Sequence, residues 1–291
     1  MRLALTTGAL VTSFLVIGCG SKIAPSDSIS DPSRPFPGLE FLVLSPTATV
    51  VSSETRSHVA GLRPMVLSVM NLQSEAQFND FHAALARDGL TYSFTRFVTA
   101  NTPDKHIGIL AMQEPSEVIL HSNLTYKSEG EALVVRRPFT ELQFGTRAAD
   151  SPKKVILLAH LKSTTFHPAN QYEMRRNEAR LLGNRAQKIL ALYPNAELLV
   201  AGVLQDDPDS ANLKAICRDT LVDLRPADAA GAVWTTMVRN KDTYRRTSYL
   251  LATTNLAARI PSSGLFINTP LDINWSLDHR PLAVELFEEE E

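Results

Sequence analysis

The 291-residue sequence has little cysteine, no surplus of positive charge and no apolar run of membrane-spanning length. Of its two cysteines, Cys217 falls on the apolar face of an expected helix, as a small core residue does, and Cys19 belongs to the N-terminal segment. The 29 basic and 31 acidic residues give a net charge of −2. Proteins that bind the phosphate backbone of nucleic acid usually have more basic than acidic residues. The nearly equal numbers here therefore argue against nucleic acid as the partner.

The first 38 residues have the pattern of a leader followed by a tether. The apolar stretch at 3–17 follows a basic residue and is too short for a convincing transmembrane helix, which is typical of a secretory signal. It ends in Val-Ile-Gly-Cys at 16–19, which resembles a bacterial lipobox. We expect a lipoprotein signal peptide at 1–18, a membrane lipid anchor on Cys19, and a flexible tether rich in Ser, Pro and Asp at 19–38.

A plain cleaved signal with an incidental cysteine is the alternative to lipidation. If Cys19 is acylated, the expected location is the bacterial cell envelope, at the outer membrane or another extracytoplasmic membrane face.

We expect residues 39–291 to form one domain, because no linker interrupts its core. The most informative part of this domain is the segment 155–210. The apolar runs at 155–159 and 198–203 are expected to be buried strands, and a capping-box start with an apolar face predicts a helix at 171–192 between them. Polar side chains follow the first strand at 160–163 and the second at 204–210. We therefore place the candidate site where these two strands end.

Further strands and helices are expected on both sides of this block. Apolar runs bounded by turn residues predict strands, and capping residues before apolar periodicity predict helices. The expected strands are 41–44, 65–70, 106–112, 117–121, 132–136, 141–144 and 282–287, and the expected helices are 56–62, 74–89 and 210–221.

Four motifs in this order resemble the endonuclease/exonuclease/phosphatase superfamily of metal-dependent phosphoesterases. They read His-Leu-Lys-Ser at 160–163, Arg-Arg-Asn-Glu-Ala at 175–179, Gly-Val-Leu-Gln-Asp-Asp-Pro at 202–208 and Ser-Leu-Asp-His-Arg-Pro at 276–281. Each alone is weak, but four in the family's order, on agreeing strands and helices, are specific. The resemblance implies an α+β fold, a four-layer αββα sandwich of two packed mixed β-sheets with helices on the outer faces.

The resemblance fails at the positions that hold the family's metal. The principal metal-ligating Glu aligns with Asn71, the strand-end Asp with Val203, the Asn with Gln205, and the Asp that orients a catalytic His with Ser248. Divalent cations need several hard oxygen ligands, carboxylates among them, to compete with their own water shells. We therefore expect no metal cofactor, and a phosphoesterase without its metal loses several kcal/mol of transition-state stabilisation.

The resemblance also assigns roles to residues that are retained. His279 matches the catalytic base, His160 matches the His that steadies developing charge, and Asp278 matches an acidic partner in the site. The order of the motifs predicts that His160, Val203 and His279 meet at one edge of the sandwich. The candidate substrate-binding residues are Lys162, Gln205 and Asn71.

Three interpretations stay open. The favoured one is a membrane-tethered, catalytically impaired monomer that acts as a binding or scaffold module for an unknown protein or a phosphate-bearing ligand. The second is an active phosphodiesterase or phosphatase with a rebuilt Mg²⁺ or Mn²⁺ site. The third is a different α/β lipoprotein that shares these patterns by chance. The acids available for a rebuilt site are Glu75, Asp206, Asp207, Asp209 and Asp278.

Two smaller expectations concern charge at the surface. Asp206 and Asp207 follow the strand end and are expected to face solvent, where Pro208 fixes the turn. The basic pair Arg136 and Arg137 is expected to be ordinary solvating charge.

Overall fold

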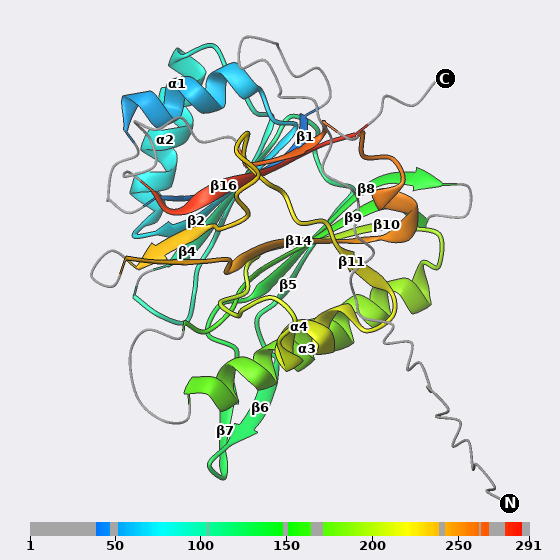
Figure 1. The fold of residues 1–291 in the computed structure, drawn as a ribbon. Helices are drawn as coiled ribbons and strands as arrows, with labels where there is room; N and C mark the ends of the chain where they lie inside the picture. The colour runs from blue at the N-terminus through cyan, green and yellow to red at the C-terminus, as the bar shows by residue number, and fades with distance from the viewer. Residues whose placement is uncertain are drawn as a thin grey trace, which may run out of the picture.

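The computed structural model describes residues 39–46, 52–103, 105–147, 151–163, 171–238, 242–261, 263–267 and 277–286. Within these ranges the chain forms two six-stranded β-sheets packed face to face, with helices on the two outer faces (Figure 1). The α+β sandwich that the motifs imply is thus confirmed. The expected signal peptide, Cys19 and the tether lie outside these ranges. None of the helices that the structure describes is long and apolar enough to cross a membrane.

The first sheet carries α1 (Ser53–Leu62) and α2 (Glu75–Arg87) on its outer face (Figure 1). Strands β1 and β2 run parallel and their other neighbours are antiparallel, so the sheet is mixed. In spatial order its strands are β15 (Leu265–Phe266), β16 (Leu277–Glu285), β1 (Leu39–Pro46), β2 (Val66–Leu72), β4 (His106–Ala111) and β3 (Phe94–Val98).

The second sheet carries α3 (Gln171–Leu192) and α4 (Ala211–Cys217) on its outer face (Figure 1). It is also mixed, because β9 and β10 run parallel within antiparallel surroundings. In spatial order its strands are β11 (Leu221–Asp223), β14 (Ser248–Thr253), β10 (Glu197–Val203), β9 (Ser151–His160), β8 (Phe139–Arg147) and β5 (Glu117–His121).

Two small hairpins and one short helix complete the described elements. The hairpin of β6 (Thr125–Ser128) and β7 (Glu131–Val134) projects beyond α3 in Figure 1. The hairpin of β12 (Thr236–Val238) and β13 (Thr243–Arg245) leads into β14, which is followed by α5 (Thr254–Ala257).

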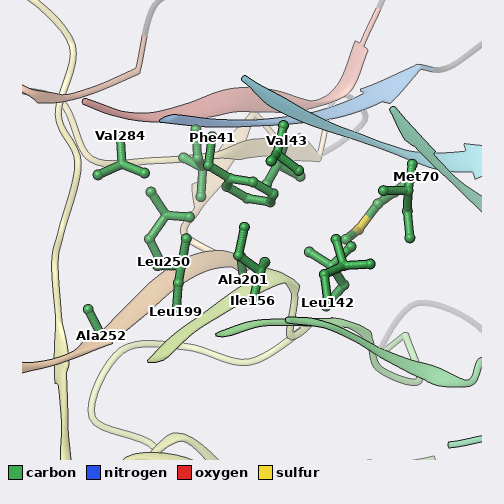
Figure 2. Close-up of a cluster of buried hydrophobic side chains, with 14 of the residues drawn as sticks. Phe41, Val43, Met70, Leu142, Ile156, Leu199, Ala201, Leu250, Ala252 and Val284 are labelled. Carbon is green, nitrogen blue, oxygen red and sulfur yellow. The ribbon is translucent and has the colours of Figure 1, made fainter. Parts of the chain in front are cut away.

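The core between the sheets is apolar, and strand alternation decides which side chains enter it. On β9, Ile156 and Leu158 lie in this core, whereas Val155 and Leu157 pack under α3 on the other face. Figure 2 shows side chains of the two sheets, such as Phe41 of β1 and Ala201 of β10, pointing into the space between them. Each sheet is therefore covered on both faces, which explains the continuous apolar runs in the sequence.

Most expected elements are present, with shifted ends. The expected helix at 56–62 begins earlier because Ser52 caps it, its Oγ accepting from the Thr55 N–H at 3.2 Å. The expected helix at 210–221 ends at Cys217, because the chain turns at Arg218 and then enters β11. Cys217 is buried, as its place on an apolar face predicts.

Candidate active site

Three neighbouring strands of the second sheet, β9, β10 and β14, place three side chains next to one another at one edge of the sheet. Val203 pairs with His160 of β9 on one side and with Ser248 of β14 on the other. The residues two positions further into each strand all lie in the inter-sheet core. Because side chains alternate along a strand, the row faces the first sheet at the edge of that core.

His279 of β16 comes from the first sheet and meets this row. Its Nδ1 lies 3.0 Å from Ser248 Oγ and 3.2 Å from Thr247 Oγ1, and the ring is buried. Ser248 thus gives this histidine a hydroxyl partner at the position that the motif resemblance aligns with a carboxylate. His160, Val203 and His279, which are far apart in the sequence, come together as the order of the motifs predicts.

The two histidines are held in the neutral state. Burial, then the charges of Arg137, His279 and Lys105, keeps the pKa of His160 well below its ordinary value. Burial and the charge of Lys105 lower the pKa of His279 to about 4. A general base works best with a pKa near the operating pH, and a hydroxyl cannot support an imidazolium as a carboxylate does. His279 is therefore poorly prepared to accept a proton at neutral pH.

The residues that the motif resemblance aligns with metal ligands do not fit a divalent cation. Val203 is 0% exposed and belongs to the inter-sheet core. Asn71 and Gln205 are largely buried amides in left-handed backbone, with φ values of 64° and 59°. Over the part of the chain that the structure describes, no group of three or more His, Cys, Asp or Glu side chains is arranged to hold a metal ion. Amides and an aliphatic side chain supply none of the carboxylate charge that Mg²⁺ prefers.

The acids in the loop after β10 each have an arginine neighbour, and the buried pair of Asp206 and the bidentate pair of Asp207 limit the use of these two carboxylates as metal ligands. Bidentate or buried arginine–carboxylate pairs are among the stronger hydrogen-bonded contacts. The pairs are Asp206 with Arg175 (Oδ2 to Nε, 3.1 Å), Asp207 with Arg245 (Oδ2 to Nη2, 2.8 Å) and Asp209 with Arg225 (Oδ1 to Nη2, 3.9 Å).

The expectation that Asp206 faces solvent is wrong. Asp206 is buried, because Arg175 of α3 and Asn212 of α4 both donate to its Oδ2. Asp207 is exposed as expected, with 59% of its side chain accessible. The buried Asp206 therefore connects the loop to two helices.

The remaining acids proposed for a rebuilt metal site are Glu75 and Asp278. Glu75 occupies the first turn of α2, directly after Ser74, whose Oγ caps the helix by accepting from the Gln77 N–H at 3.2 Å. A carboxylate there is an ordinary complement to the helix dipole. Asp278 lies on β16, but its side chain falls outside the described part of the structure.

Arg137 is a buried neighbour of the site, although in the sequence it looks like half of an ordinary basic pair. It is 5% exposed, and its Nη1 donates to the carbonyl oxygens of His160 at 3.2 Å and Leu161 at 3.0 Å. The expectation of ordinary surface charge is therefore wrong for Arg137, because its guanidinium is needed to satisfy the backbone where β9 ends.

Lys162 and Glu178 meet beside this arginine. The Lys162 N–H donates to Glu178 Oε2 at 2.8 Å. Burial raises the pKa of Glu178 against the opposing effects of this hydrogen bond and of Arg137. Burial and the charges of Arg136 and Arg137 lower the pKa of Lys162. The acid of the second motif thus supports the backbone that carries Lys162.

Lys105 is a site residue that the sequence did not reveal. It stands directly before β4, and its charge lowers the pKa of His160, His279 and Lys162. Its neighbour His106 has a structural contact, because its Nδ1 accepts from the Ala100 N–H at 2.9 Å. The sequence shows only that Lys105 is a cation directly before an expected strand. The folded structure is needed to show that Lys105 lies near His160 and His279.

Neither a protein-family model nor a curated protein matches the chain by sequence. Solved structures match it closely in shape. The 3′ phosphatase NExo from Neisseria has a TM-score of 0.64 at 12% identity, covering 86% of this chain and 100% of that one. Truncated TDP2 from Caenorhabditis elegans has a TM-score of 0.59 at 13% identity, covering 87% and 99%.

A protein from Leptotrichia buccalis, described as an endonuclease/exonuclease/phosphatase family protein, also matches with a TM-score of 0.59 at 12% identity, over 86% of this chain and 100% of that one. At such low identity the likeness shows the fold alone. The chain therefore has the fold of endonuclease/exonuclease/phosphatase proteins over 86% of its length.

Proposed function

We propose that this protein is a lipid-anchored envelope protein whose endonuclease/exonuclease/phosphatase-like domain has lost metal-dependent phosphoester hydrolysis and serves as a binding or scaffold module. The anchor rests on the lipobox-like residues 16–19 and the tether behind them. The loss of hydrolysis rests on the site. The observation that carries it is Val203, an aliphatic side chain within the core at the strand end where the family places a carboxylate.

The other contacts of the site support the same conclusion. Ser248 gives His279 a hydroxyl partner in place of a carboxylate. The loop acids that would rebuild a metal site are paired with arginines, and freeing a buried one such as Asp206 would leave Arg175 without its partner. Breaking a buried ion pair by removing one member costs about 3–5 kcal/mol. A rebuilt site would have to recover that free energy from the metal itself.

A hydrolysis assay tests this proposal. The purified protein, in non-ionic detergent with Mg²⁺ or Mn²⁺, should release p-nitrophenol from bis(p-nitrophenyl) phosphate and from p-nitrophenyl phosphate at the rate of buffer. His160→Ala and His279→Ala should not lower that rate further, and His82→Ala, on the half-buried side of α2, serves as the matched control. Metal-dependent turnover that either site variant abolishes, while the control keeps it, would establish the alternative of an active phosphoesterase.

A further inference from the structure

The solvent side of α3 carries a row of cationic side chains. Residues spaced four apart on a helix form one ridge along its surface, and one ridge of α3 consists of Arg176, Arg180, Asn184 and Lys188. The three cations of this ridge are exposed, and Asn184 is half-buried. From Arg176 to Lys188 the ridge extends about 18 Å along the helix axis. This length suits an extended anionic surface better than a small ligand.

Helix α4 adds two cations to this row. It lies beside α3 on the outer face of the second sheet (Figure 1). Lys214 of α4 and Arg218, which caps the helix one turn later, are both exposed, and Arg218 Nη2 donates to Asn184 Oδ1 of the ridge. The five exposed cations, named here the basic face, are Arg176, Arg180, Lys188, Lys214 and Arg218.

Few acids balance the basic face. Among the described residues, no ion pair joins a carboxylate to any of its five side chains. The acids beside it in the sequence are the exposed Asp219 and the half-buried Glu173, whose Oε2 accepts from Ser128 Oγ at 3.1 Å. In a chain with a net charge of −2, the basic face therefore concentrates positive potential on one side of the domain.

Exposed apolar side chains lie at the two ends of the ridge. Tyr172, one turn before Arg176, is 50% exposed, and Leu192, one turn after Lys188, is 62% exposed. Cations together with aromatic and aliphatic side chains are typical of protein surfaces that rest at the boundary between lipid headgroups and acyl chains. This combination favours a membrane over a soluble polyanion as the partner of the basic face.

We propose that the basic face docks on an anionic phospholipid surface and orients the domain with α3 and α4 toward the membrane. This rests on the lipid anchor proposed above, because an anchored domain stays close to lipid headgroups. The proposed tether at 19–38 leads into β1 of the first sheet and, when extended, would reach up to about 70 Å. The two helical layers are only about 30 Å apart, so such a tether allows the α3–α4 layer to face the membrane.

Vesicle flotation tests the proposal on the purified full-length chain that carries Cys19→Ser, so that acylation does not contribute to binding. The vesicles contain phosphatidylcholine alone or phosphatidylcholine mixed with phosphatidylglycerol. We expect binding to the anionic vesicles that weakens as salt is added, and much weaker binding to the neutral vesicles. Residues 1–38 are identical in all the variants compared, so differences between these variants report on the folded domain.

Two substitutions and two controls locate the docking surface. Arg180→Gln and Lys188→Gln should each weaken binding to anionic vesicles roughly five-fold, and together roughly twenty-five-fold. Arg87→Gln/Arg96→Gln removes the same charge from exposed positions on α2 and β3 and should bind like the parent chain. Arg180→Lys/Lys188→Arg keeps the charge and should also bind like the parent chain. Circular dichroism confirms that each variant is folded.

Three results would overturn the proposal. They are equal binding of the parent chain to neutral and anionic vesicles, equal losses in the two double variants that remove charge, and tighter binding to double-stranded DNA than to anionic vesicles at the same salt concentration. Any of them would leave the lipid anchor intact if Cys19 of the wild-type chain incorporates palmitate in cells. The proposed loss of hydrolysis is likewise judged separately, by the hydrolysis assay.

Discussion

Burial of His279 among hydroxyl groups connects the stability of the fold to pH. Its pKa is lowered from 6.5 to about 4 by burial and by Lys105. The unfolded chain therefore binds a proton more tightly than the folded one between these values, so this contribution to stability is complete above about pH 6.5 and is lost as the pH falls toward 4. Between about pH 7 and pH 5 the loss amounts to roughly 2 kcal/mol.

Urea unfolding at these two pH values measures the effect. His279→Asn keeps a polar side chain near Ser248 but removes the titration, so it should lose about 2 kcal/mol less than the wild type on acidification. Comparing slopes cancels the opposite contribution of Glu178, whose pKa is raised by burial. His82→Asn on α2 is the control and should keep the wild-type slope. Equal slopes for wild type and His279→Asn would show that His279 is not buried in the neutral state.

At the level of elements, the contact between α3 and α4 depends on a glycine. A Cβ atom at Gly183 would lie 2.2 Å from the carbonyl oxygen of Ala215 on α4. Gly183→Ala should therefore destabilise the protein by roughly 2 kcal/mol or more, although alanine is the better helix former. Gly61→Ala in α1 is the matched control, because a Cβ there meets no atom within 4 Å and should stabilise by roughly 0.5–1 kcal/mol. Thermal unfolding compares the two, and equal shifts of Tm would refute this packing.

How far the sequence predicts an element depends on how strongly that element is patterned. Helix α3 occupies 171–192 as expected, since its length and apolar face leave no alternative. The sequence did not predict strand β3, because it is an edge strand that contains polar residues. It did not predict β6 either, because that strand is only four residues long. The burial of Arg137 could not be predicted, because it depends on a long-range contact with the end of β9 and not on local sequence.

For the whole molecule, the order of four motifs was enough to predict the sandwich and the meeting of His160, Val203 and His279. That prediction came from a family resemblance, since spacing alone gives no register between distant strands. The position of Lys105 stayed hidden because it depends on how the loop before β4 folds, and the Asn101 N–H of that loop donates to the Arg136 carbonyl oxygen at 2.7 Å. Charges brought together by tertiary contacts leave no periodic signal in a sequence.

Attachment to a membrane is a property of the whole chain and is tested at Cys19. Cys19→Ser should release the protein from the membrane fraction or leave it unprocessed, because several acyl chains together anchor a protein stably. Cell fractionation and metabolic labelling with palmitate measure this, and Cys217→Ser, in the buried position on α4, is the control that should keep both the label and the location. Equal membrane association and labelling of wild type and Cys19→Ser would count against lipidation.

Titration of Mg²⁺ and Mn²⁺ into the purified protein tests most directly whether this site has lost its divalent metal ion. We expect no saturable binding by the wild type, because Val203 and Asn71 supply no carboxylate at the strand ends. The variant Val203→Asp/Asn71→Glu, if circular dichroism shows it folded, should gain measurable metal affinity before any turnover, since Ser248 still leaves His279 without a carboxylate partner. Stoichiometric, tight binding of Mg²⁺ or Mn²⁺ by the wild-type protein, lost in His160→Ala or Asp278→Asn, would show that the site still holds a metal ion.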